Sequence, residues 1–360
     1  MKRRRLVVAA CAVACLAPAA ALAGGSAGSV TVVADGLNNP RNLSLGPDGA
    51  IYVAEAGKAG RNCIDEETCI GRTASVTRIA GGAKRRVVTA LLSAGSRDGT
   101  FAVGAHGASV APDGTIYVAM TAAPECMPTR DLPAYARTQQ GRLLVRGASA
   151  KPPRVRPAAN IGRVECATNP DGTDKNSNPY AVLTLRRGRS IVVDAGANAV
   201  FDVRSRKVTV LALIPKNRGR QAVPTSIARG PDGAYYVGEL AEGAGNRKAR
   251  VHRIVPGEKP TVHATGFTAI TGLAFGPDGS MYVTQFTTDL KRFAPTGSVV
   301  KVAPDGTRTT LGVGRLVYPS GAVVDAAGAL YVSNFSVAPA RTPKNSPFKG
   351  AGGQVVRVDG

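Results

Sequence analysis

Apolar and polar residues alternate with a period of two along most of the chain, a pattern typical of half-buried β-strands. One phrase recurs: an alternating run, a turn that reads Pro-Asp-Gly in four copies, and a run such as Ile-Tyr-Val. Proline presets φ, aspartate bonds the backbone and glycine takes positive φ, so each copy predicts a β-hairpin. The six copies occupy residues 43–55, 108–120, 182–194, 226–239, 273–285 and 322–334.

A second pair of β-rich runs follows most hairpins, for example residues 75–79 and 86–91. The repeating unit is therefore four short antiparallel strands. The turn glycines of successive units are 65, 74, 45, 46 and 49 residues apart. Four strands in about 45 residues are the pattern of a β-propeller blade. We therefore predict an all-β protein, a single six-bladed β-propeller that spans residues 24–360.

The two chain ends complement each other. The last unit stops after residues 354–358, which match the third strand of the other blades. The missing fourth strand is supplied by residues 29–34, near the start of the chain. Pairing these two segments would close the ring and remove its open edges.

The first 23 residues form a secretory signal peptide by pattern: MKRRR, an apolar stretch, and Ala-Leu-Ala before the expected cleavage after Ala23. A short membrane anchor and a lipoprotein modified at Cys11 are the alternatives. Beyond this segment no apolar run reaches the roughly 20 residues that span a bilayer. We expect a secreted protein without a membrane span.

Four cysteines remain after cleavage: Cys63, Cys69, Cys126 and Cys166. An even number in an exported protein predicts two disulfides. Five residues separate Cys63 from Cys69, a loop that closes easily, and Cys126 then pairs with Cys166. A zinc site is the alternative, although the spacing does not match paired-cysteine zinc motifs.

Charge and aromatic content bear on partners. The formal net charge is +22, and it becomes +18 once the four basic residues of the signal peptide are removed. Such a charge favours anionic partners, either a small molecule or an anionic extracellular polymer. The chain has no Trp and only 5% aromatic residues, which argues against an aromatic stacking platform and against sequence-specific nucleic-acid recognition. We expect a monomer.

A ring of polar positions is predicted at one face, where second strands end and first strands begin. Carboxylate and amide groups there could hold Ca²⁺, with Glu55, Asp194, Glu239 and Asn334 as metal ligands. His106 begins a first strand and could act as a general base. The remaining residues of the predicted ligand face are Asn42, Asn178, Tyr180, Thr225 and Gln285. A solvated tunnel rim is the alternative interpretation.

The insertion at residues 163–180 offers a second set of oxygen atoms. They could bind Ca²⁺ or could simply cap turns, since Asn and Asp do both. The set consists of Asn169, Asp171, Thr173, Asp174, Asn176 and Asn178.

The chain resembles the ScyD/ScyE family of secreted bacterial proteins over essentially its whole mature length. The most specific segment runs from Asn-Pro-Asp-Gly at 169–172 to Ser-Asn-Pro-Tyr at 177–180. Cys166-Ala167-Thr168 departs from the acidic or aromatic lead-in expected there. The other matching segments are residues 37–43, 46–49, 192–198, 223–226, 230–233, 238–240, 266–268 and 274–280. The resemblance implies a six-bladed propeller and carries no established activity.

Three functions remain open from the sequence. The first is a secreted binding or accessory protein that uses the tunnel-mouth face, because the chain has no G-x-S-x-G nucleophile elbow between a strand and a helix and no H-E-x-x-H motif. The alternative is a metal-dependent, lactonase-like hydrolase with a calcium-type ion in the tunnel. An accessory role in secondary metabolism is suggested only by the name of the ScyD/ScyE family.

Overall fold

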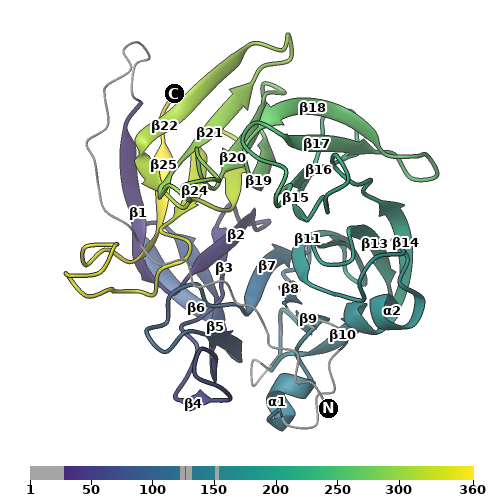
Figure 1. Ribbon diagram of the computed structural model, residues 1–360, viewed down its shortest axis with the longest axis vertical. Helices are drawn as coiled ribbons and strands as arrows, with labels where there is room; N and C mark the ends of the chain where they lie inside the picture. Colours follow the sequence, from purple (N-terminus) through teal and green to yellow (C-terminus); the bar gives the residue numbers. More distant parts are fainter. Residues whose placement is uncertain (1–27, 122–125, 127–131, 151–153) are drawn as a thin grey trace.

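The structure is a computed structural model that describes residues 28–121, 126, 132–150 and 154–360. Six antiparallel sheets are arranged in a ring around a central axis (Figure 1). Only two short helices, α1 (Ala134–Arg137) and α2 (Ile161–Thr168), lie outside the sheets in the described residues. The prediction of an all-β, six-bladed propeller is confirmed.

Each blade is a sheet of four strands, and blade 1 carries the additional short strand β4 (Asn62–Cys63). Blade 1 consists of β2 (Pro40–Leu45), β3 (Ile51–Glu55), β5 (Cys69–Ala80) and β6 (Ala83–Gly95). Blade 2 consists of β7 (Ala105–Val110), β8 (Ile116–Met120), β9 (Arg142–Arg146) and β10 (Arg156–Asn160). Blade 3 consists of β11 (Pro179–Arg186), β12 (Arg189–Asp194), β13 (Ala199–Arg204) and β14 (Lys207–Leu213). Blade 4 consists of β15 (Pro224–Arg229), β16 (Tyr235–Glu239), β17 (Ala249–Ile254) and β18 (Thr261–Phe267). Blade 5 consists of β19 (Ile270–Phe275), β20 (Met281–Gln285), β21 (Thr296–Val302) and β22 (Arg308–Val317). Blade 6 consists of β23 (Ala322–Val324), β24 (Leu330–Asn334), β25 (Gly353–Val358) and β1 (Val30–Leu37).

The ring is closed by its two chain ends, as the sequence predicts. Strand β1 pairs antiparallel with β25, and the register runs from Val30 opposite Val358 to Leu37 opposite Gly353. Strand β1 is therefore the outermost strand of blade 6, so the first and last strands of the chain are paired in the same sheet.

The hydrophobic core lies between neighbouring blades. The second strands β3, β8 and β16 are buried along their whole length, because they are covered by a blade on each side. The innermost strands approach closely and need small residues. A Cβ added to Gly272 would lie 2.4 Å from the Ser320 carbonyl oxygen, and one added to Gly321 would lie 2.4 Å from the Leu43 nitrogen. The centre of the ring is therefore tightly packed.

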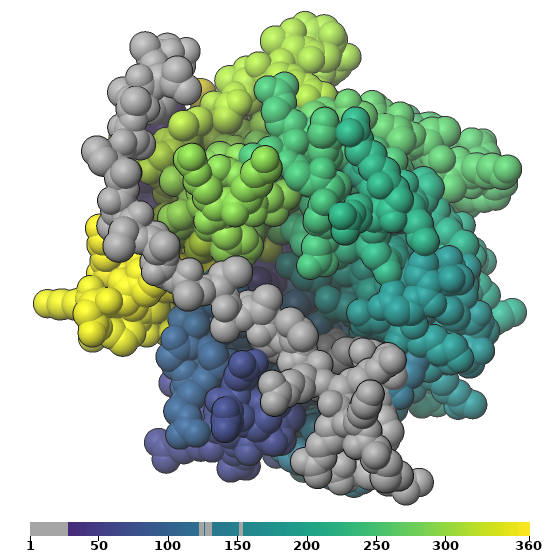
Figure 2. Space-filling view, in the orientation of Figure 1, coloured from purple at the N-terminus to yellow at the C-terminus, as the bar shows by residue number. Residues whose placement is uncertain are grey.

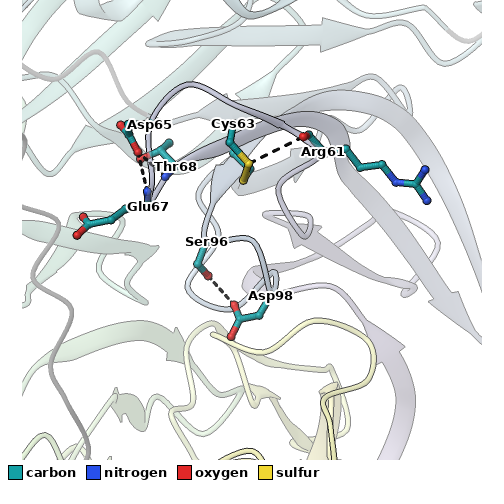
Figure 3. Close-up of a disulfide and its surroundings, with 8 residues drawn as sticks. Arg61, Cys63, Asp65, Glu67, Thr68, Ser96 and Asp98 are labelled. Atoms are coloured by element: carbon teal, nitrogen blue, oxygen red, sulfur yellow. Dashed lines mark hydrogen bonds between the residues drawn. A yellow bond between two sulfur atoms is a disulfide. The ribbon is translucent and has the colours of Figure 1, made fainter.

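Both predicted disulfides are present. Cys63 and Cys69 close a loop in which the Asp65 carboxylate accepts the Glu67 and Thr68 N–H groups at 2.9 and 2.6 Å (Figure 3). Cys126 and Cys166 connect the insertion of blade 2 to α2. No helix among the described residues is long and apolar enough to cross a membrane. The predicted signal peptide, residues 1–23, lies outside the described part of the chain.

Candidate functional site

Each of the five inner strands β2, β7, β11, β15 and β19 begins with a β-bulge. In β11, for example, Pro179 pairs with Asp194 and Ala181 with Val193, so the residue between them has no partner on β12. Bulges of this kind re-aim a side chain and are frequent beside functional sites. Blade 6 has Ser320 at the corresponding position, just ahead of β23. The bulge residues are Arg41, His106, Tyr180, Thr225 and Thr271.

The threonines at this position fasten one blade to the next. The Thr225 hydroxyl donates to the Ile270 carbonyl at 2.6 Å. Equivalently, the Thr271 hydroxyl donates to the Pro319 carbonyl at 3.1 Å. A small hydroxyl residue is therefore sufficient for the structural task at this position.

Blades 1 to 3 depart from this pattern, because the same position carries three large polar side chains in succession. Arg41 is 7% exposed and His106 is 3% exposed. The rings of His106 and Tyr180 meet edge-on with centroids 4.6 Å apart. Arg41 is electrostatically coupled to both: the Tyr180 side chain raises the pKa of Arg41, and the Arg41 charge lowers the pKa of His106. We call Arg41, His106 and Tyr180 the mouth cluster.

The mouth cluster leaves hydrogen-bonding capacity unused. One Arg41 Nη donates to the Ala102 carbonyl at 2.7 Å, while its Nε is buried without a partner. Both ring nitrogens of His106 are likewise buried and unpartnered. Within the described residues, no carboxylate acts on the Arg41 charge. Buried polar groups are ordinarily paired, so this concentration of unpaired nitrogen atoms is exceptional.

Burial controls the charge of the cluster. It lowers the pKa of Arg41, an effect that the Tyr180 side chain opposes. Burial, and next the Arg41 charge, lower the pKa of His106 well below its ordinary value. At neutral pH the imidazole is therefore neutral, and the cluster carries the positive charge of Arg41. A His106 that resists protonation is a poor general base in the unliganded protein.

The predicted ring of strand-end residues is engaged within individual blades. Glu55, Asp194, Gln285 and Asn334 each accept a backbone N–H from the segment that leads into their own blade's inner strand, at 2.6 to 2.7 Å. Glu239 accepts from Arg250 at 2.8 Å and lies 3.0 Å from the His252 Nε2. These side chains fasten loops and neighbouring strands.

The carboxylates of that ring are not brought together. Across the described residues, no group of three or more His, Cys, Asp or Glu side chains is placed to hold a metal ion. Glu55 illustrates the reason: its oxygens are already occupied by Ser75, Thr77 and Arg86. The donor atoms proposed for Ca²⁺ thus have protein partners in this structure.

Asn42 crosses the central tunnel. Its amide donates to the Tyr180 carbonyl of blade 3 at 3.2 Å and lies 3.5 Å from the Thr225 carbonyl of blade 4. The cavity beside it has a volume of about 20 Å³, enough for about one water molecule. The inside of the tunnel is therefore too narrow for an organic ligand. Figure 2 shows the green and teal blades packed side by side along one half of the ring.

The insertion that precedes β11 contains a buried acid that sequence inspection did not single out. Glu165 of α2 is 0% exposed, and neither carboxyl oxygen has a hydrogen-bond partner. Burial, and then the nearby Asp171 and Asp194, raise its pKa to about 7. Asp171 accepts the Thr173 N–H at 3.0 Å and the Asn198 amide at 2.8 Å, which matches the turn-capping alternative.

Six aromatic residues form a group at the same face. Five of the eight phenylalanines surround Tyr318, whose ring stacks on Phe286 at 4.8 Å. Phe101 and Phe293 contribute to this group although they are 47% and 38% exposed. We call this group the aromatic rim; its members are Phe101, Phe286, Phe293, Tyr318, Phe335 and Phe348. Composition alone does not report this clustering, and most of the ring pairs are tilted or edge-on, so the group is not the flat stacking platform that the composition argued against.

Residues 157–347 match the SMP-30/Gluconolactonase/LRE-like region, which is more than half of the chain. The chain belongs to this family. No curated protein matches it. Among solved structures, it resembles the calcium-binding protein regucalcin from Agrobacterium tumefaciens, with 13% identity over 92% of this chain and 95% of that one and a TM-score of 0.55.

Two further structures show the same likeness. The putative oxidoreductase (glucose dehydrogenase) of Thermus thermophilus is 15% identical, covers 92% of this chain and 99% of that one, and has a TM-score of 0.55. The PQQ-bound aldose sugar dehydrogenase of Streptomyces coelicolor is 14% identical, with 94% and 99% covered and a TM-score of 0.53. At such identities these likenesses establish the fold.

In this SMP-30/gluconolactonase-type propeller, two of the residues predicted for the site belong to the mouth cluster. His106 and Tyr180 lie in it together, Asn178 immediately precedes β11, and Thr225 is the second residue of β15. Gln285 is occupied by the Thr268 N–H and by Ser298. Arg41 was the important omission. Its signal was available in the sequence, because an arginine stands where blades 4 and 5 have threonine.

Proposed function

We propose that the protein is an exported binding protein that captures an anionic group at the tunnel mouth. The observation that carries this proposal is the buried Arg41 guanidinium, which has no carboxylate partner among the described residues. An unpaired charge is costly to bury, so a bound anion would relieve that cost. Guanidinium groups also match carboxylate and phosphate geometry with two parallel hydrogen bonds.

The neighbours of Arg41 fit the same chemistry. The two unpartnered His106 nitrogens provide one N–H donor in the neutral ring, and Tyr180 adds a hydroxyl beside them. The three residues come from three rigid blades, so little ordering entropy opposes ligand capture. Export is supported by the pattern of residues 1–23 and by the two disulfides. The ScyD/ScyE resemblance supports a secreted propeller of this kind.

Lactone hydrolysis is the second candidate, and it is favoured by the match to the SMP-30/gluconolactonase region. The two functions differ in what the site must supply. Hydrolysis needs an activated water, from a metal ion or a competent base, whereas capture needs only the cationic Arg41 and its neighbouring donors. Turnover of a lactone panel by the mature protein, dependent on added divalent cation, would establish the second candidate and displace the first.

Anion binding is tested by titrating acetate and inorganic phosphate against thermal unfolding and calorimetry at constant ionic strength. At a hundredfold excess over its dissociation constant, a bound anion stabilises the protein by about 2.7 kcal/mol. The variant Arg41→Gln should lose this stabilisation. The matched control is Arg315→Gln, which removes the same charge from an exposed position. If both variants respond to the anions like the wild type, the proposal is wrong.

A further inference from the structure

The aromatic rim and the mouth cluster are joined by a single peptide unit. Arg41 donates to the carbonyl of Ala102 at 2.7 Å, and Phe101 is the residue immediately before Ala102. The Phe101 ring contacts the rings of Phe293 and Tyr318, each with centroids 6.3 Å apart. The tunnel mouth therefore presents a buried cation next to an exposed apolar surface.

The exposed rings are held in place by backbone contacts. The Phe101 N–H donates to the Val337 carbonyl at 2.9 Å, and the Tyr318 hydroxyl donates to the Phe293 carbonyl at 2.8 Å. Phe101 and Phe293 have φ of 51° and 47°. Bulky residues rarely adopt this left-handed conformation, so its cost must be offset by the surrounding structure. The rim is thus a fixed surface.

A role in packing the local core explains only some members of the aromatic rim. Phe286 and Phe348 are buried and pack on Tyr318, so they build the local core. Phe101 and Phe293 instead leave much of their ring surface in water. Exposed apolar groups clustered in this way are typical of binding sites, and these two lie on the side of the mouth that Arg41 reaches through Ala102.

We propose that the ligand is an aromatic carboxylate, whose carboxylate binds Arg41 and whose ring packs on Phe101 and Phe293. This inference rests on the proposed anion capture and adds the apolar body of the ligand. A carboxylate satisfies the guanidinium fork, while a planar ring adds offset or edge-on contacts to the two phenylalanines. The tunnel is too narrow for the ring, so the ring lies at the rim.

The test compares acetate with benzoate and 2-naphthoate by calorimetry on the mature protein. All three carry one carboxylate, so the ratio of their dissociation constants isolates the contribution of the ring. We expect 2-naphthoate to bind at least about tenfold more tightly than acetate. Arg41→Gln should abolish binding of all three ligands.

The variant Phe101→Asn separates the two parts of the site, because asparagine tolerates the left-handed backbone of this position. It should leave the acetate dissociation constant unchanged and remove most of the preference for 2-naphthoate. Val313→Asn, on an exposed apolar residue of β22, is the matched control and should keep the preference.

The outcomes distinguish the two proposals. If none of the three anions binds, anion capture is wrong and this inference falls with it. If acetate binds and the aromatic acids bind no better, anion capture stands and the aromatic ligand is rejected. Equal weakening of acetate and 2-naphthoate by Phe101→Asn would also reject it, because the ring would then act only through the position of Arg41.

Discussion

At the scale of single residues, the same backbone position serves two purposes. In blades 4 and 5 a threonine hydroxyl at the bulge bonds the next blade, whereas blades 1 to 3 carry Arg41, His106 and Tyr180 there. The bulge itself is a property of the fold, so evolution can change its side chain without rebuilding the sheet. Because the backbone bulge does not depend on the side chain that it carries, a propeller with repeated blades can have the large polar side chains of the mouth cluster in only three of its six blades.

Glu165 gives a prediction about pH. Its pKa is raised from 4.5 to about 7, chiefly by burial, so the folded state holds a proton that the unfolded chain releases. Its contribution to stability is complete below about pH 4.5 and is lost as the pH rises through 7. Glu165→Gln should therefore raise the melting temperature at pH 8 and flatten its decline between pH 5 and 8.

The control for this experiment is Glu258→Gln, which changes an exposed acid and should leave the pH profile as it is in the wild type. A profile for Glu165→Gln that is parallel to the wild type would show that Glu165 does not titrate in this range.

At the scale of elements, the hairpins and their order were predictable because each hairpin is encoded by residues that are adjacent in the sequence. Pro-Asp-Gly specifies a turn, and alternation specifies which face of a strand is buried. The roles of the strand-end acids were not predictable. Glu239 binds Arg250 and His252 of the adjacent strand β17 and Asn217 of a preceding loop, and these partners are known only once the register of the sheet is known.

This difference yields a test of the strand-end carboxylates. Glu239 is 0% exposed and binds Arg250, which is itself mostly buried. Removing one member of such a pair leaves an uncompensated charge and costs about 3–5 kcal/mol. Glu239→Gln should therefore lower the metal-free melting temperature markedly, while Glu242→Gln at an exposed position should not.

A shared calcium site would behave differently. Carboxylates held together to bind a metal repel each other when the metal is absent, so their neutralisation would leave the metal-free protein as stable or more stable. Titration of calcium, magnesium, manganese and zinc against thermal unfolding completes the comparison. A cation that stabilises the wild type and not Glu239→Gln would restore the metal interpretation.

At the scale of the whole molecule, the chain ends depend on each other. Strand β1 forms its whole ladder with β25, and β25 is also paired with β24 in blade 6. A chain that begins at residue 38 lacks β1 and leaves blade 6 with an open edge. We expect it to lose the cooperative thermal transition of a chain that spans residues 24–360.

Circular dichroism and calorimetry of both forms measure this effect. A shortened chain with an unchanged melting temperature would show that closure contributes nothing to stability. Adding a synthetic peptide of residues 28–37 should restore part of the transition, which distinguishes loss of the strand from a general effect of truncation.

The pairing of Val30 with Val358 also determines how the protein can assemble incorrectly. The two ends must find each other across nearly the whole chain, a slow step because the entropy of so large a loop is lost before the ladder forms. During that delay, a second molecule at high concentration can present the same β1 to the same open edge. Refolding at high protein concentration should therefore yield dimers and larger oligomers in which molecules exchange their first strand, while refolding at low protein concentration yields monomers.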